Sequence, residues 1–405
     1  MRHERSAAFI IIIAVFLAAL PRITASIYTP SMPSLVGYFG TSEAAVQWTF
    51  SSYIIGLALG QIIYGPLSDA WGRRPVILAG LFFFTLTSSI IAFAPSIFLL
   101  GLGRFVEAIS AASGGVLARA IVRDLMGPAS TVRAIAYVTM ATTLSPAVGP
   151  LVGGQLEHHF GWQANFLALG AAGFALALVC FFMLPETRRP EHAAPSGIKG
   201  MMYGFVKLLR APAFLAYSFS GGFLLSMQLV FYGSAPFLFI KLLDISPRDY
   251  GFYTVTGVAG FMIGNFIVTR TRDLTDTARM VLIGSIVAFT GAFMMMVLTG
   301  LFGLSVWGLI GPFTLATMGS GIAMPNAMAG SLNRYPEIAG TSSSLSGFIG
   351  MILAAGSTAS LGLLLASSGL PATILMTILA AIALVVAFIN PERRRAKEES
   401  APSRF

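Results

Sequence analysis

Long apolar runs alternate with short polar breaks along the entire chain. A helix crosses the ~30 Å hydrocarbon core of a bilayer with about 20 mostly apolar residues. This criterion predicts twelve spanning helices, at 8–28, 45–67, 76–94, 97–119, 131–155, 163–184, 213–239, 250–269, 280–300, 302–324, 339–366 and 371–389. The first run follows two arginines, as in a signal peptide. No small-residue cleavage site follows it, so we expect a retained first span.

The longest polar stretch, 185–212, divides the twelve spans into two sets of six. Transporters built from internal repeats show this kind of symmetry. We therefore expect an all-α integral membrane protein whose twelve transmembrane helices form two pseudo-symmetric six-helix bundles. The expected parts are an N-terminal bundle at 8–184, a cytoplasmic linker at 185–212, a C-terminal bundle at 213–390 and a basic cytoplasmic tail at 391–405.

The composition also indicates a membrane protein without a metal or cofactor. Of the 405 residues, 56% are hydrophobic and 10% are charged, whereas soluble domains have about 25% charged residues. The single cysteine, Cys180, excludes a disulfide framework and a cysteine-based metal site. The four histidines fall in the N-terminal tail and in loops: His3, His158, His159 and His192. We expect no metal and no cofactor.

Lysine and arginine are unevenly distributed between the loops. With both termini in the cytoplasm, 21 of the 25 basic residues lie on the cytoplasmic side, as the positive-inside rule requires. Of the other four, Lys241 and Arg248 fall on the outer side of the membrane, and Arg22 and Arg104 fall inside spans. The net charge of +9 then matches anionic lipid headgroups and needs no nucleic acid. We expect a monomeric, multi-pass protein of the cell inner (cytoplasmic) membrane, with the lipid bilayer as its partner.

Three charged residues, Arg22, Arg104 and Glu107, lie well inside predicted spans. Each such charge costs about 2.5–3.5 kcal/mol on insertion scales, so each is a functional candidate. A rise of about 1.5 Å per residue places both arginines at similar depth and Glu107 near the midplane. Arg104 and Glu107 are three residues apart and share a helix face. They are either a structural ion pair or, as we favour, a site where Glu107 takes up and releases a proton.

The sequence GPLSDAWGRRP at 65–75 joins the second and third spans. It is either a tight hairpin with flanking positive charge or a latch between helix ends. It resembles the loop motif G-x-L-x-D-R-x-G-R-R/K of the major facilitator superfamily, with Ala70 in place of the usual Arg. The resemblance implies a cytoplasmic gate built around Asp69 and Arg74. Without a basic residue at position 70, we expect a weaker latch or one partnered by Arg119 or Arg123. The gate candidates are Asp69, Arg73, Arg74, Arg119, Arg123 and Asp124.

Other segments extend the resemblance over nearly the whole chain. Gly103–Asp124 is similar to the span-4 motif with its intramembrane arginine, and Ser145–Gly154 to the span-5 motif of antiporters. ARAIVRDL, GWQANF and PEIAGTSSSLSG resemble the Bcr/CflA branch of bacterial drug exporters. The span-5 motif contributes small and helix-bending residues, which allow close helix contact in lipid. They are Pro146, Gly149, Pro150, Gly153 and Gly154.

The first span departs from the Bcr/CflA pattern T-D-x-Y-L-P-x-x-P. In ASIYTPSMP, Tyr28, Pro30 and Pro33 match, but Ser26 replaces the Asp that is thought to couple to protons or cationic drugs. Arg22 lies one helical turn earlier. We therefore expect proton coupling to depend on Glu107 with Arg104 and Arg22. We also expect neutral or anionic cargo rather than lipophilic cations.

The family resemblance implies a central cavity lined by spans 1, 2, 4, 5, 7, 8, 10 and 11. Amphipathic side chains on these spans are candidate cavity residues, although each could equally be a packing residue or an interfacial anchor. The candidates are Ser26, Tyr28, Tyr53, Gln61, Gln228, Tyr232 and Asn265.

The expected function is secondary active multidrug efflux. Small hydrophobic compounds would be exported in exchange for protons by alternating access. An enzyme is not expected, because no HExxH, CxxC or GxSxG pattern occurs, and no GxxxxGK[ST] loop is present for ATP hydrolysis. The alternative is a proton-independent facilitator or an importer of a small metabolite, because a fold does not decide function.

Overall fold

The structure, a computed structural model, describes residues 2–126, 128–187, 197–271, 276–362 and 368–392. Nearly all of these residues are helical, and no strand occurs among them. Parts of the expected linker and tail lie outside the described residues. Eight of the 21 basic residues that we expect on the cytoplasmic side also lie outside the described residues: Arg188, Arg189, Arg272, Arg393, Arg394, Arg395, Lys397 and Arg404.

All twelve expected spans are confirmed as helices long and apolar enough to cross a membrane. They are Ala8–Tyr38, Glu43–Trp71, Arg73–Ile91, Ile97–Leu125, Arg133–Phe160, Gln163–Met183, Pro212–Leu242, Pro247–Arg270, Thr277–Phe302, Val306–Asn333, Ala339–Gly362 and Leu370–Phe388. Several helices extend beyond the apolar run that predicts them, because a helix continues into the headgroup region where water and caps satisfy its ends. The last residues of the eleventh expected span lie outside the described part of the chain.

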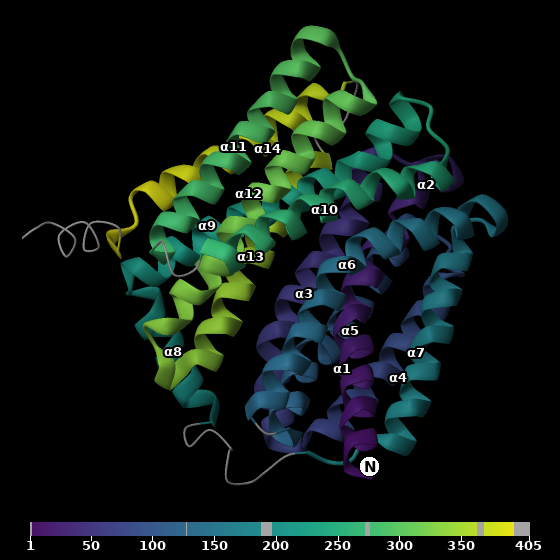
Figure 1. The fold of residues 1–405 in the computed structure, drawn as a ribbon. Coiled ribbons are helices and arrows are strands. Elements are labelled where there is room, and N and C mark those ends of the chain that lie inside the picture. Colours follow the sequence, from purple (N-terminus) through teal and green to yellow (C-terminus); the bar gives the residue numbers. More distant parts are fainter. Residues whose placement is uncertain (1, 127, 188–196, 272–275, 363–367, 393–405) are drawn as a thin grey trace, which may run out of the picture. The chain divides into compact units, whose positions relative to one another are not determined.

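The first compact unit comprises residues 1–197 together with 239–255. Its helices are α1 (Arg2–Ile27), η1 (Thr29–Ser31), α2 (Met32–Tyr38), α3 (Glu43–Trp71), α4 (Arg73–Ile91), α5 (Ile97–Leu125), α6 (Pro128–Phe160) and α7 (Gln163–Met183). Helix α5 packs against α1, α3 and α4, while α6 packs on α1 and α7 on α4 (Figure 1). Helix α5, which carries Arg104 and Glu107, therefore lies at the centre of this unit.

The second compact unit comprises residues 198–238 and 256–405. Its helices are α8 (Gly197–Leu209), α9 (Pro212–Pro236), most of α10 (Pro247–Thr271), α11 (Thr277–Phe302), α12 (Val306–Asn333), η4 (Pro336–Ile338), α13 (Ala339–Gly362) and α14 (Leu370–Phe388). A π-helical turn, η3 (Phe237–Leu242), continues α9. Helix α9 packs against α12, α13 and α14, and α11 packs against α12 and α14. Helix α8 occupies part of the expected linker.

Glycine pairs and serine N-caps occur at equivalent positions in the two units. Gly56 and Gly60 of α3 lie against α5, and Gly260 and Gly264 of α10 lie against α12. Both pairs begin thirteen residues after the first residue of their helices. Ser96 caps α5 and Ser305 caps α12, each accepting a hydrogen bond from the backbone N–H three residues later, as serine caps do. The fold thus consists of two related helical units.

Candidate functional site

Arg104 and Glu107 form an ion pair that is completely buried in the first unit. Arg104 Nη1 and Glu107 Oε2 are 2.6 Å apart, and both side chains are 0% exposed. Their spacing on α5 brings the two groups together on one face, as the sequence predicts. Burying two charges carries a large desolvation cost, which is offset only if hydrogen bonds satisfy the remaining polar atoms.

Neighbouring helices supply those hydrogen bonds. Ser88 on α4 donates its hydroxyl to Glu107 Oε1 at 2.7 Å. Arg104 Nη2 donates to the backbone carbonyl of Thr24 on α1 at 3.1 Å. Both carboxylate oxygens of Glu107 are therefore engaged, while Nε of Arg104 has no hydrogen-bond partner in the described structure.

Aromatic rings enclose the Arg104 guanidinium. Its central carbon lies 4.2 Å from the ring centre of Tyr28, 4.0 Å from that of Tyr53 and 5.7 Å from that of Phe166. Each such cation–π contact is worth roughly 0.5–2 kcal/mol, depending on desolvation. The Tyr28 hydroxyl shares a 3.1 Å hydrogen bond with Thr49. The cluster thus connects α5 to α1, α3, α4 and α7.

The glycines of the span-5 motif form a close seam between α6 and α1. A Cβ at Gly149 would meet the side chain of Ser26, and one at Gly153 would meet the backbone carbonyl of Ile27. Ser26 is only 9% exposed. It therefore packs against the seam instead of facing open space. Of the other motif residues, Pro146 and Pro150 lie within α6, and Gly154 lies against the backbone of Pro247.

A second charged cluster joins the ends of α3, α4 and α5. Arg73 pairs with Asp69 at 2.6 Å and with Asp124 at 3.3 Å, and it also donates to the Ser68 hydroxyl. We expected either a weaker latch or one partnered by Arg119 or Arg123; in the structure Asp69 pairs with Arg73. The physical reason is that Arg73, four residues after Asp69, begins the next helix within reach of both carboxylates.

Glu186, just after α7, joins the same cluster by capping α4. Its two carboxylate oxygens accept hydrogen bonds from the backbone N–H groups of Arg73 at 2.9 Å and Arg74 at 3.2 Å. Arg74 Nη2 donates to the carbonyl of Phe181 at 2.6 Å. Gly72, at φ +98°, makes the turn between α3 and α4, and a Cβ there would meet the Glu186 carboxylate. Arg74 therefore connects α4 to α7 instead of pairing with Asp69.

Glu186→Ala is expected to destabilise the first unit by about 1 kcal/mol, because it removes a helix cap and a negative charge from the α4 N-terminus. Thermal unfolding of the purified protein in detergent would measure the loss. Glu337→Ala is the control. Glu337 forms an exposed pair with Lys207, and exposed pairs contribute little to stability. Equal losses in both variants would contradict the capping role.

The remaining basic candidates form no ion pair within the described structure. Arg22 on α1 is half-buried, and Arg119 and Arg123 on α5 are exposed. Within the described structure no carboxylate lies within ion-pair distance of any of the three. Arg22 therefore makes no ion pair with Glu107, and its part in proton coupling stays a prediction.

The candidate cavity residues differ in how accessible they are. Tyr28 and Tyr53 are fully buried around Arg104. Gln61, Tyr232 and Asn265 are half-buried. In the second unit, Gln228 donates to the sulfur of Met324 at 3.6 Å.

Several residues of these clusters carry no clear sequence signal. Ser88 is one hydroxyl among many in its span, Thr24 contributes only its backbone carbonyl, and Phe166 is one of 32 phenylalanines. Glu186 could have been identified as the acid that directly follows the sixth span. Among the described residues, no three His, Cys, Asp or Glu side chains gather as a metal site would require.

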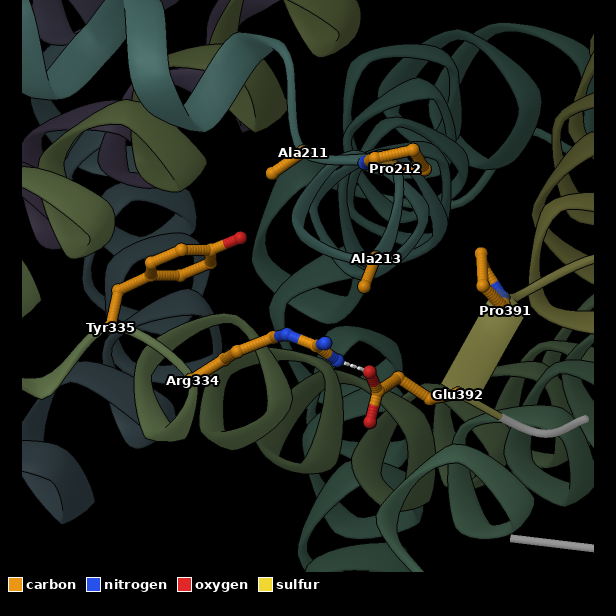
Figure 2. Close-up of a pocket in the computed structure, with 7 residues that line it drawn as sticks. All are labelled: Ala211, Pro212, Ala213, Arg334, Tyr335, Pro391 and Glu392. Carbon is orange, nitrogen blue, oxygen red and sulfur yellow. Dashed lines mark ion pairs between the residues drawn. The ribbon is translucent and has the colours of Figure 1, made fainter. Parts of the chain in front are cut away.

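A small pocket lies at one end of the second unit, where Arg334 after α12 pairs with Glu392 after α14 (Figure 2). Ala211, Pro212, Ala213, Tyr335 and Pro391 complete its lining. Its volume is about 170 Å³, below the roughly 300–1,000 Å³ of ligand pockets. We therefore interpret it as a junction between helix ends and not as a substrate site.

Comparison with known proteins places the chain among membrane transporters. It is 27% identical to the bicyclomycin resistance protein homologue of Haemophilus influenzae, over 86% of this chain and 87% of that protein. It is 26% identical to multidrug resistance protein D of Escherichia coli, over 99% and 100% of the two chains.

Solved structures share the fold at low sequence identity. A bacterial homologue of the human lysosomal transporter Spinster, inward-facing and unoccupied, has a TM-score of 0.75 at 16% identity and covers 95% of this chain and 97% of its own. The partially occluded, inward-open xylose transporter XylE of Escherichia coli has a TM-score of 0.74 at 11% identity, with 98% of both chains covered. The family model of the Major Facilitator Superfamily matches residues 11–358, and the chain therefore belongs to that family.

Proposed function

We propose that the protein is a secondary active multidrug efflux transporter. It exports small hydrophobic, neutral or anionic compounds in exchange for protons. The buried Arg104–Glu107 pair carries this proposal, because an ionisable carboxylate inside a spanning helix is costly to keep without a role. The relatives named for bicyclomycin and multidrug resistance support drug-like cargo.

Protonation of Glu107 would act on four helices at once. A neutral Glu107 no longer balances the charge of Arg104. The contacts of Arg104 with Thr24 on α1, Tyr53 on α3 and Phe166 on α7 would then change in strength. A proton can shift a conformational equilibrium only by as much as its differential affinity for the two states. Glu107 is placed where such a difference would affect the packing of α5.

The other assignments are part of the same proposal. Asp69, Arg73, Arg74 and Asp124, together with Glu186, form the cytoplasmic gate of the first unit; the contacts of Glu186 with the start of α4 support its inclusion. Bundles at 8–184 and 213–390 are joined by the linker at 185–212. The protein lies as a monomer in the cell inner membrane with both termini in the cytoplasm, an orientation that rests on the distribution of basic residues.

A second candidate is a proton-independent facilitator or importer of the same fold. One feature of the pair favours it: both Glu107 oxygens are engaged and the side chain is 0% exposed. A purely structural ion pair would have the same geometry.

Proteoliposomes loaded at acidic pH distinguish the two functions. We expect accumulation of a neutral probe, naphthalene-1-sulfonamide, only while the lumen is acidic. One pH unit supports about a tenfold gradient for one exchanged proton. A protonophore should abolish this accumulation, and empty liposomes correct for passive entry. Equilibration of the probe regardless of the gradient would contradict the exporter and support the facilitator.

A further inference from the structure

Arg22 and Arg119 are among the arginines of the first unit for which the described residues provide no carboxylate partner. Arg22 on α1 is half-buried and Arg119 on α5 is exposed, and neither takes part in an ion pair within the described structure. A charge within a spanning helix needs a partner, water or a ligand. The two residues are therefore unexplained charges on two helices that pack against each other, α1 and α5.

Helix packing brings together the parts of α1 and α5 that carry these two arginines. The Pro21 ring lies 3.0 Å from the position of a Cβ on Gly115. Arg22 follows Pro21, and Arg119 comes one helical turn after Gly115. Thr24 contacts Arg104 earlier on α5, so α1 and α5 run antiparallel. Because helical side chains lean toward the N-terminus of their own helix, Arg22 and Arg119 lean toward each other.

The two arginines carry like charges, and the acids of their unit are engaged elsewhere. Arg119 acts repulsively on Arg22, and Tyr53 is the other group that acts on it. The carboxylates described between residues 8 and 187 all contact other groups. Glu43 contacts Lys241, Asp69 and Asp124 contact Arg73, Glu107 contacts Arg104, Glu157 contacts Ser31 and Ser34, and Glu186 contacts the start of α4. No acid of this segment remains to neutralise the two arginines.

We propose that Arg22 and Arg119 together bind the oxyanion group of an amphiphilic substrate, such as a carboxylate, sulfonate or phosphate. Guanidinium groups present planar pairs of N–H donors that match such groups, and the protein covers neither side chain completely. The substrate's charge would also relieve the repulsion between the two arginines. The inference rests on the proposed transport function and defines its substrate class as organic anions.

Calorimetric titration of the purified protein in nanodiscs tests this site with two matched probes, naphthalene-1-sulfonate and neutral naphthalene-1-sulfonamide. The wild type should prefer the sulfonate. Arg22→Gln and Arg119→Gln should each weaken sulfonate binding about tenfold or more, as expected for loss of a charged hydrogen bond, and leave sulfonamide binding unchanged. The control variant Arg133→Gln removes an exposed arginine of the same unit. It should change neither sulfonate binding nor sulfonamide binding. Sulfonamide binding also reports that each variant is folded.

A wild type without preference for the sulfonate would overturn the proposal. So would glutamine variants that bind it as tightly as the wild type, or that lose both probes equally. The exporter proposal fails in a different experiment. Transport of the sulfonamide that ignores the proton gradient would contradict the exporter, but calorimetry would still show the preference for the sulfonate and its dependence on the two arginines.

Discussion

Arg104→Met is expected to destabilise the protein by about 3–5 kcal/mol, the cost of leaving one member of a buried ion pair without its partner. Glu107 is 0% exposed and would retain only the Ser88 hydroxyl as a hydrogen-bond partner. Methionine fits between Tyr28 and Tyr53, because a thioether packs well against rings, so steric effects remain small. Equilibrium unfolding in detergent micelles would measure the difference.

The double variant Arg104→Met/Glu107→Met separates charge from packing. It removes both ions, and apolar residues of similar volume often replace a buried pair at little cost. We expect it to recover most of the stability lost in the single variant. A single variant as stable as the wild type, or a double variant less stable than the single one, would show that the pair does not behave as a buried ion pair.

Glu107→Gln is expected to abolish proton-driven transport while leaving substrate binding intact. Glutamine keeps the size of the side chain and can still accept from Arg104, but it cannot exchange a proton. The roughly tenfold accumulation of naphthalene-1-sulfonamide supported by one pH unit should disappear, and calorimetric binding of the same probe should persist. Ser88→Ala is the matched variant, since it removes a neighbour of Glu107 and leaves the carboxylate ionisable. Transport that survives in Glu107→Gln would exclude Glu107 as the proton carrier.

The fold could be predicted almost completely from the sequence, because the bilayer makes span length and hydrophobicity decisive. All twelve spans are found. The helix ends could not be predicted equally well, since they are set by caps such as Ser96 and by turns such as Gly72. Helix α8 within the expected linker is too short for the criterion that identifies spans.

Contacts of the candidate site could be predicted only between residues that are close together in the sequence. Arg104 and Glu107 follow from i, i+3 spacing, and Asp69 and Arg73 lie within one short segment. The contributions of Ser88, Tyr53 and Phe166 depend on contacts between helices that no local pattern reports. Arg22 illustrates the limit. Its depth suggested a place beside Glu107, whereas it forms no ion pair in the described structure and the residue before it, Pro21, packs against Gly115 of α5.

The central claim is that Glu107 carries the proton exchanged for substrate. Its most direct test is proton release from acid-loaded proteoliposomes, followed with an internal pH-sensitive dye, when naphthalene-1-sulfonamide is added outside. The account predicts release in the wild type and in Ser88→Ala, and none in Glu107→Gln. Substrate entry without proton release in the wild type, or release that persists in Glu107→Gln, would contradict it.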